Sequence, residues 1–237
     1  MPLLVLMLLA ACHTSDYLSY SWDGRRILCS DAIDDFEGNA PWALVDDQLG
    51  YAKTESRVAL FHAHVPGETI SIAGIQRILD HADANHLEYI TYGELVPGPA
   101  RAGLALAFDD NSVDAWLGIR DLLAAHGAHV TFFVTRYSEL SDEERAGIDV
   151  LANEGHDIQP HSVDHPHGIQ YVNDNGLDAY VQDEVLPSIE VLKTAGYLAN
   201  DEKITYAYPF GEHTGAMDQA IIPYVDKLRV SPGSCPW

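Results

Sequence analysis

The sequence predicts a single α/β domain in which short parallel strands alternate with helices and close, or nearly close, into a barrel. After residue 57, about seven apolar strand-like segments alternate with amphipathic helical segments, an order typical of parallel sheets with right-handed crossovers. This number of strands favours a barrel over an open doubly wound sheet. A chain of 237 residues, 47% hydrophobic and 21% charged, also has the usual size and composition of one such domain.

Each element follows from its local pattern. Short apolar runs between polar turns predict strands, and the expected strands cover residues 26–29, 58–61, 89–92, 104–108, 130–134, 157–159, 204–208 and 228–230. Apolar residues three and four apart predict helices, and the expected helices cover residues 71–84, 113–126, 141–153 and 177–195. Ser141 and Glu144 form a capping box at the start of the third helix, and Gly155 ends it. Pro187 either kinks the fourth helix or is tolerated within it.

Residues 1–11 form a separate unit. Their apolar run is too short to span a bilayer, and small residues lead from it into Cys12. This arrangement resembles a bacterial lipoprotein signal, although no Lys or Arg precedes the run. We therefore expect cleavage before Cys12, lipidation of that cysteine, and an exported protein whose lipid anchor holds it on the periplasmic side or the cell surface. The alternative is a buried N-terminal strand or helix.

Charge and cysteine count narrow the possible partners. The 36 acidic and 13 basic residues give a net charge of −23, which excludes binding of nucleic acid or anionic lipid through the protein surface. Export leaves Cys29 and Cys235 as an even pair in an oxidising compartment, so we expect a disulfide between them rather than two separate buried thiols. A bridge that closes so long a loop stabilises by up to about 5 kcal/mol. Residues 12–57 form an acidic segment ahead of the barrel.

Polar side chains that can carry chemistry follow three of the expected strands. Asp109 and Asp110 end one strand, a histidine-rich stretch at residues 161–165 follows another, and residues 209–211 follow a third. Active sites of α/β barrels lie at the carboxyl ends of the strands. If the strands form a barrel, these groups lie on the same rim.

The histidine spacing indicates a metal site. His161 and His165 are four residues apart, so a single helical turn would place both imidazoles on one face. Two imidazoles and one carboxylate, with a position left for water, are typical of catalytic zinc, and Co²⁺ or Ni²⁺ suits the same ligands. Of Asp109 and Asp110, one carboxylate can bind the metal while the other faces the substrate as a general base.

Three ordered motifs resemble those of the polysaccharide deacetylase family, also called the NodB-homology domain or carbohydrate esterase family 4. The stretch Phe108-Asp109-Asp110-Asn111 is similar to its Thr-Phe-Asp-Asp-Gly motif. Residues 155–165 are similar to its Gly-His-Glu-Ile-x-x-His-Ser/Thr-x-x-His segment, and residues 208–211 to its third motif. The likeness spans residues 58–230. It assigns residues 58–237 as the catalytic domain and implies a distorted (β/α)7 barrel.

The resemblance implies a role for each motif residue. Asp109 is the general base, while Asp110, His161 and His165 bind the divalent metal. The backbone N–H of Phe210 helps to hold the oxyanion, as preorganised amides do for a tetrahedral intermediate. The implied reaction is metal-dependent hydrolysis of N-acetyl groups, or less often O-acetyl groups, on a sugar polymer.

Two parts of the family pattern are displaced or missing. The motif that carries the catalytic acid is absent near the C-terminus, but residues 58–64 resemble it placed first, as in exported poly-N-acetylglucosamine deacetylases. His62 is then the acid, with His64 the close alternative. Many family members brace the base with an Arg at the position of Ala207, and Arg136 is a candidate substitute.

The remaining histidines have no motif role. His156, His167 and His213 lie near the motifs, and we expect them to be loop residues or to support the site from behind.

The expected function is therefore removal of N-acetyl groups from an N-acetylglucosamine-type glycan of the cell envelope by a monomeric, lipid-anchored enzyme. Two alternatives stay open. One is an O-acetyl esterase or small-molecule amidohydrolase on the same fold, because fold does not fix substrate. The other is a non-catalytic glycan-binding lipoprotein that keeps the metal site.

Overall fold

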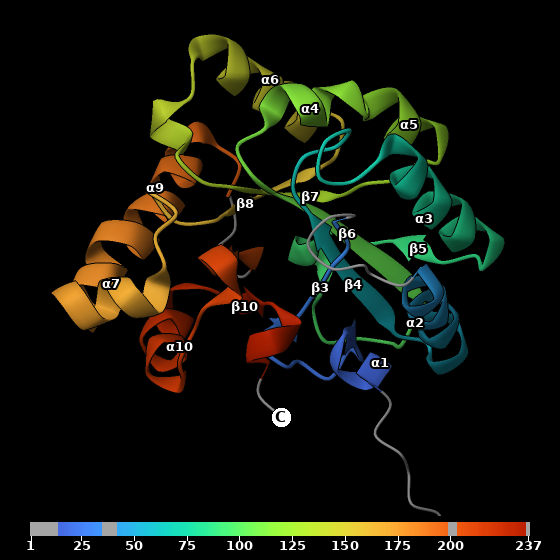
Figure 1. Cartoon of the computed structure of the whole chain (residues 1–237), viewed down its shortest axis with the longest axis horizontal. Helices are drawn as coiled ribbons and strands as arrows, with labels where there is room; N and C mark the ends of the chain where they lie inside the picture. The colour runs from blue at the N-terminus through green and yellow to red at the C-terminus, as the bar shows by residue number, and fades with distance from the viewer. Residues whose placement is uncertain (1–13, 35–41, 199–202, 236–237) are drawn as a thin grey trace, which may run out of the picture.

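A computed structural model describes residues 14–34, 42–198 and 203–235 and shows an α/β fold built on two sheets (Figure 1). The large sheet has seven strands: β1 (Ser19–Tyr20), β3 (Asp31–Ala32), β4 (Val58–Ala63), β5 (Glu88–Tyr89), β6 (Gly103–Asp110), β7 (Thr131–Val134) and β8 (Asp157–Pro160). The small sheet has three: β2 (Ile27–Cys29), β9 (Thr205–Ala207) and β10 (Lys227–Val230). All strand pairs are parallel except β1 with β4.

Helices surround the sheets (Figure 1). The α-helices are α1 (Thr14–Tyr17), α2 (Trp42–Glu55), α3 (Ile72–Ala84), α4 (Val113–Gly118), α5 (Arg120–Ala125), α6 (Asp142–Asn153), α7 (Gly168–Asn175), α8 (Leu177–Tyr180), α9 (Leu186–Ala195) and α10 (Gly215–Ile221). The shorter turns are the 3-10 segments η1 (Tyr92–Glu94), η2 (Tyr137–Glu139), η5 (Pro209–Gly211), η6 (Ile222–Tyr224) and η7 (Pro232–Ser234), and the π-helix η3 (Val181–Val185).

One segment joins the two sheets into an incomplete barrel. Residues 27–32 pair with both sheets, because β2 lies beside β10 and β3 lies beside β4. Between β8 and β9 no strand pairing occurs in the described ranges. The side chain of Gln159 spans this gap: its Oε1 accepts from the Thr205 N–H at 2.8 Å and its Nε2 donates to the Lys203 carbonyl at 3.2 Å. The structure therefore has the expected arrangement of a parallel α/β barrel, but the barrel is open between β8 and β9, a gap that we call the seam.

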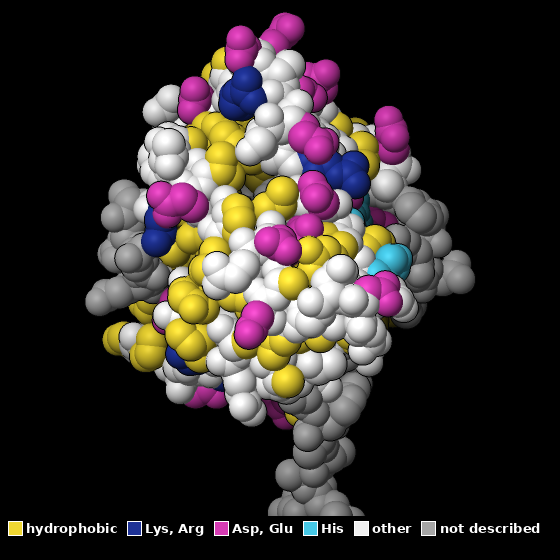
Figure 2. Space-filling view, turned by 90° about the vertical axis from the view of Figure 1, so that its left-hand side faces the viewer, with side chains coloured by type: hydrophobic (Ala, Val, Ile, Leu, Met, Phe, Trp, Pro, Cys, Tyr) yellow, Lys and Arg dark blue, Asp and Glu magenta, His cyan; other side chains and the backbone are white. Residues whose placement is uncertain are grey.

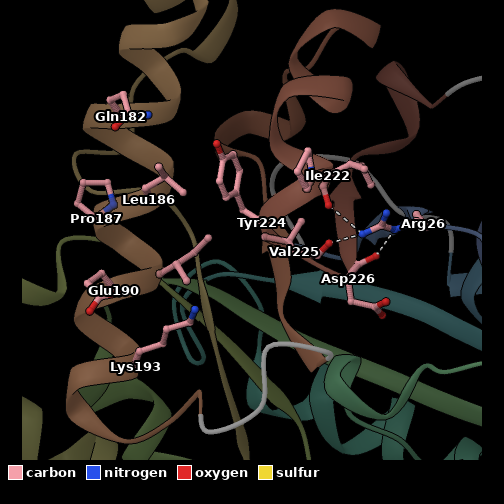
Figure 3. A pocket seen from close by; sticks show the side chains of 12 residues that line it. Arg26, Gln182, Leu186, Pro187, Glu190, Lys193, Ile222, Tyr224, Val225 and Asp226 are labelled. Atoms are coloured by element: carbon pink, nitrogen blue, oxygen red, sulfur yellow. Dashed lines mark hydrogen bonds between the residues drawn. The ribbon is translucent and has the colours of Figure 1, made fainter.

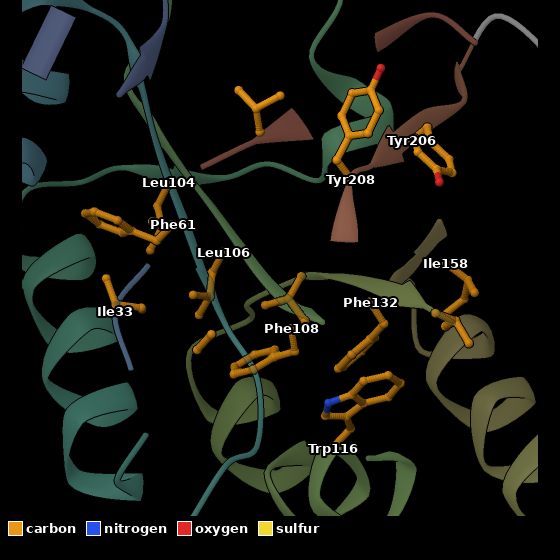
Figure 4. Packing of buried hydrophobic residues seen from close by; sticks show 14 of the residues in the cluster. Ile33, Phe61, Leu104, Leu106, Phe108, Trp116, Phe132, Ile158, Tyr206 and Tyr208 are labelled. Carbon is orange, nitrogen blue, oxygen red and sulfur yellow. The ribbon is translucent and has the colours of Figure 1, made fainter. Parts of the chain in front are cut away.

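Side-chain alternation along the strands separates two apolar layers. The outward-facing residues of β6 and β7 pack beneath the helices (Figure 4), and this layer includes Leu104, Leu106, Phe108, Phe132 and Trp116. The intervening Ala105 and Ala107 belong to the second cluster, inside the barrel, with Tyr92 and Phe133. Two methyl side chains leave space inside the barrel for larger groups. Asp109 continues this inward-facing row.

Two expected helices are interrupted. Residues 113–126 form α4 and α5, which meet at Ile119. Residues 177–195 form α8, the π-helix η3 and α9, because Pro187 has no N–H to donate to the carbonyl four residues earlier. The Leu186 N–H instead bonds the Val181 carbonyl, five residues back. Pro187 thus widens the helix by a π-turn.

The N-terminal region contributes directly to the sheets. Within residues 14–34 and 42–57, strands β1 and β3 belong to the large sheet and β2 belongs to the small sheet. Helix α2 buries one face that includes Val45, Leu49 and Ala52. The division of the chain at residue 57 stays a prediction. Residues 1–11 and Cys12, on which the lipoprotein interpretation depends, lie outside the described residues. No helix in the described part of the chain combines the length and apolar character needed to cross a membrane.

The expected disulfide is confirmed. Cys29, in β2, is bonded to Cys235, which follows η7. The bond joins residues 206 positions apart in the sequence. It holds the C-terminal turn against the strand that connects the two sheets.

Candidate active site

The predicted site residues meet in one cavity of about 430 Å³ at the carboxyl ends of the parallel strands. The predicted site residues that line it are His62, His64, Asp109, Asp110, His161, His165 and Phe210. They come from β4 and the residue that follows it, from β6, and from the segments after β8 and β9. The strand-end placement predicted from the sequence is therefore observed.

Three side chains converge as a metal site would require. The Nε2 atoms of His161 and His165 are 3.2 Å apart, and Asp110 Oδ1 lies 3.2 Å from His165 Nε2 and 3.7 Å from His161 Nε2. Their candidate ligand atoms all lie within 4.8 Å of one another. Asp110 Oδ1 is buried without a hydrogen bond of good geometry among the described residues. The three ligand atoms thus face a common point.

A carbonyl group fixes which nitrogen of His161 is available. His161 Nδ1 lies 2.9 Å from the Ala207 carbonyl oxygen, which can only accept, so Nδ1 carries the proton and Nε2 keeps its lone pair. Burial, with Arg229 adding to it, lowers the pKa of His161 to about 4 despite the opposing charge of Asp109. A neutral imidazole with Nε2 exposed to the cluster is the form that binds metal.

The backbone that carries the two histidines is not the helical turn expected from their spacing. Ser162 and His165 have positive φ values of 68° and 58°, and the His165 N–H donates to Ser162 Oγ at 3.0 Å. Asp110 is also left-handed, with a φ of 83°. The side chains meet as predicted, but through a turn that contains two left-handed residues.

Asp109 is 2% exposed and pairs with the guanidinium of Arg229. Burial alone would raise the pKa of Asp109, but Arg229 and then His161 hold the pKa well below its usual value. Asp109 Oδ1 is buried without a partner in the described chain. The site therefore contains an ionised carboxylate with one oxygen available to a substrate water.

Arg229 supplies the cation whose expected position is occupied by Ala207. The two residues are direct register partners on β10 and β9, so the guanidinium enters from the neighbouring strand and lies over the Phe133 ring at 5.0 Å. Arg136, the candidate substitute, is instead exposed and donates to the Asp164 carbonyl at 3.2 Å. That expectation was wrong. An arginine between two apolar residues in a predicted strand was the available signal, since such a charge is buried only when paired.

The two histidines near the end of β4 have opposite environments. His62 is buried with Nδ1 3.0 Å from Ser30 Oγ, and burial, followed by the charge of Arg229, lowers its pKa to about 3. His64 Nδ1 lies 2.5 Å from Oδ2 of buried Asp34. Burial would lower the pKa of His64, but Asp34 outweighs it and raises the pKa to about 9. Asp34 was not predicted as a site residue, because its partner is thirty positions away.

The turn after β9 presents an aromatic ring at the mouth of the cavity. Phe210 has a φ of 57° and its side chain is 53% exposed. Its ring stacks on His167 at 3.9 Å and meets the edge of His165 at 4.6 Å. The next residue, Gly211, has no room for a side chain, because a Cβ there would lie 2.4 Å from Ser231 Oγ.

Two of the three histidines without a motif role lie close to this turn. His213 contacts Asp218 at 3.0 Å, and Tyr208 donates to the same carboxylate at 2.9 Å. His167 stacks on one face of the Phe210 ring. His156 accepts from the Val130 N–H at 3.2 Å, behind the sheet. All three therefore have structural contacts.

A larger groove of about 930 Å³ lies between α9 and η6 (Figure 3) and shares no lining residue with the site. Its one arginine, Arg26, donates to the carbonyls of Ile222, Val225 and Asp226. Figure 2 shows acidic and apolar side chains interspersed over this side of the molecule, with few basic ones. This agrees with the net charge and shows no basic surface for a polyanion on that face.

A buried carboxylate paired with an arginine lies beside three side chains that could hold a metal ion, at the mouth of an α/β barrel, and this arrangement is typical of a metal-assisted hydrolase. A family model described as "Polysaccharide deacetylase" matches residues 98–223, more than half of the chain. The chain belongs to the polysaccharide deacetylase family, a family of hydrolases that remove acetyl groups from polysaccharides.

Solved structures share the fold. The chain is similar to IcaB from Ammonifex degensii, with 18% identity and a TM-score of 0.56 over 72% of this chain and 82% of that one. It is also similar to the BpsB deacetylase domain from Bordetella bronchiseptica, with 14% identity and a TM-score of 0.50 over 66% and 83%. A search of curated proteins finds no significant match.

Proposed function

We propose that the protein is a metal-dependent deacetylase that removes N-acetyl groups from an N-acetylglucosamine-type glycan of the cell envelope. The observation that carries this proposal is the adjacency of the Asp109–Arg229 pair to the Asp110, His161 and His165 cluster. A buried, ionised carboxylate with a free oxygen beside convergent ligands is the arrangement that activates water for attack on an acyl carbon. The family membership supports the choice of an acetylated sugar polymer.

The donor set fits a zinc ion better than magnesium or calcium. Two imidazoles and one carboxylate suit zinc, with cobalt or nickel as substitutes, and the hydrogen bond from His161 Nδ1 to Ala207 is the outer support that metal-bound histidines use. The buried Oδ1 of Asp110, which faces the Nε2 atoms of both histidines, supports a cation at this point. When bound, the metal would polarise the acetyl carbonyl and make water more acidic.

The protein's own groups divide the proton transfers between them. Asp109 takes a proton from water as the water oxygen attacks the acetyl carbon. The Phe210 N–H donates to the carbonyl oxygen as negative charge develops there. We assign the acid to His64, the alternative weighed against His62, because Asp34 favours its protonated form. His64 would protonate the departing amine as the C–N bond breaks, leaving acetate and a free amino sugar.

The rim of the site supports a carbohydrate substrate. The exposed face of Phe210, backed by His167, offers an apolar surface to the C–H face of a sugar ring. The net charge of −23 disfavours anionic polymers and favours a neutral or amino-bearing glycan. The Cys29–Cys235 bond supports an oxidising compartment, and with it the export and lipid anchoring at Cys12 that the N-terminal sequence predicts.

Metal removal tests the proposal directly. Chelation should reduce acetate release from N-acetylglucosamine oligomers to background, and added Zn²⁺ should restore it, because the cluster would lose its cation. His161→Ala should lose both metal content and activity, whereas His81→Ala, a histidine on α3 that contacts Asp46, should keep both. Acetate release from acetylated xylan alone would identify an O-acetyl esterase. Bound zinc with no acetate from any glycan would identify a non-catalytic protein.

The pH dependence tests the assignment of the acid. With a raised pKa of about 9, His64 stays protonated through neutral pH, so kcat should fall as pH rises through about 9. Asp34→Asn removes the group that raises this pKa and should move the alkaline limit down by about two pH units, towards the ordinary value. Ser30→Ala, which alters the contact of His62, should leave the limit in place. The reverse outcome for these two variants would make His62 the acid.

A further inference from the structure

A buried glutamate outside the family motifs contacts the loop that carries the two histidines of the proposed metal site. Glu184 is 3% exposed, and its Oε2 accepts from the Val163 N–H at 3.1 Å and from the Asp164 N–H at 2.9 Å. Both amides lie between His161 and His165. Burial raises the pKa of Glu184, and the hydrogen bonds from the two amides oppose this effect only in part. Glu184 is therefore committed to this loop.

The π-turn brings the glutamate to this position. Glu184 lies in η3, the widened segment between α8 and α9 that Pro187 imposes. A π-turn shifts the side chains that follow it around the helix relative to an uninterrupted α-helix, and such turns are frequent at functional sites. In η3, Val181, Glu184 and Val185 are buried while Gln182 and Asp183 are exposed. The single buried carboxylate of this turn faces the histidine loop.

The loop needs support because its backbone is unfavourable. Ser162 and His165 are both left-handed, a backbone conformation that non-glycine residues keep only when the surrounding structure holds it. From the segment that follows β7, the Arg136 N–H donates to the Val163 carbonyl at 3.0 Å and Thr135 Oγ1 donates to the Ser162 carbonyl at 3.3 Å. These contacts hold the carbonyls of the loop. Glu184 holds its amides from the opposite element.

We propose that Glu184 is a positioning residue of the metal site, which sets the distance between His161 and His165 by clamping the two amides between them. This inference rests on the proposed metal-dependent function. It does not make Glu184 a ligand, because its carboxylate is engaged by the loop. The clamp depends on hydrogen-bond reach rather than on negative charge.

The test distinguishes the side-chain length of Glu184 from its negative charge. Zn²⁺ dissociation constants are measured for the metal-stripped full-length protein by competition with a chromophoric chelator, alongside Co²⁺ absorption spectra and thermal unfolding without metal. Glu184→Gln keeps the length and the acceptor oxygen, so its dissociation constant should stay within about threefold of the parent. Glu184→Asp keeps the charge but is one methylene short, and Glu184→Ala removes the acceptor. Both should weaken zinc about 10–100-fold, the usual effect of losing an outer-shell partner.

The control and the outcomes separate the two proposals. Glu190→Ala removes an exposed glutamate from α9 and should not change zinc affinity. If Glu184→Asp binds zinc like the parent while Glu184→Gln does not, charge matters and the clamp is refuted. Parental affinity in a folded Glu184→Ala also refutes it. If the parent protein itself binds no zinc, the proposed metal-dependent function fails, which is a different result from equal affinities among the variants.

Discussion

Asp109→Asn should lower kcat for acetate release by about 10²–10⁴-fold, because the amide cannot take a proton from water and general bases contribute effects of that size. The substitution keeps the shape of the side chain and its contact with Arg229. Steady-state acetate release from N-acetylglucosamine oligomers, with the metal content measured in the same samples, checks the prediction.

The matched variant is Asp110→Asn. Asp109 is not part of the Asp110, His161 and His165 cluster, so Asp109→Asn should keep its metal while Asp110→Asn loses it. Full activity in a metal-loaded Asp109→Asn protein would show that another group is the base.

Arg229→Met should lower the free energy of unfolding by about 3–5 kcal/mol, because it leaves the buried carboxylate of Asp109 without a counter-charge. The same change should raise the pKa of Asp109. The paired carboxylate contributes stability above its unfolded-state pKa and loses this contribution as pH falls through the lowered folded-state value. Without Arg229, the acidic limits of both stability and kcat should move to higher pH. Denaturant unfolding and pH–rate profiles measure the two effects.

A double variant distinguishes loss of the ion pair from loss of packing. Arg229→Met combined with Asp109→Asn leaves no unpaired charge, so it should be less destabilised than Arg229→Met alone. Because Arg229 and Ala207 are register partners, Ala207→Arg combined with Arg229→Ala should restore part of the stability and of the acidic limit. A loss below 1 kcal/mol in Arg229→Met would contradict the assigned pair.

The positions at strand ends could be predicted from the sequence because they depend on local patterns. A run such as residues 104–108 followed by two aspartates identifies a strand and its end. The parallel arrangement then places Asp109 and His161 at one rim whatever the strand order. This is why the motifs and their spacing predicted that Asp110, His161 and His165 would lie close together, as they do.

The groups that support the site could not be predicted, since each depends on which strands and helices are neighbours. Arg229 reaches Asp109 only because β10 lies inside the small sheet, and Asp34 reaches His64 only because β3 pairs with β4. Glu184 requires the π-turn, which the helical periodicity of residues 177–195 does not reveal. Local pattern thus identified the chemical groups, and tertiary contacts identified their partners.

The groups of the candidate site come from two different sheets, which are not paired at the seam between β8 and β9. The three side chains of the candidate metal site all come from the large sheet and the loop that follows it, whereas Arg229 and the Phe210 N–H belong to the small sheet and its turn. A bound acetyl group would therefore straddle two separately hydrogen-bonded sheets. Their alignment depends on contacts between the sheets, including the His161–Ala207 bond and the Asp109–Arg229 pair. These two interactions therefore help to hold the sheets together as well as to place the candidate catalytic groups.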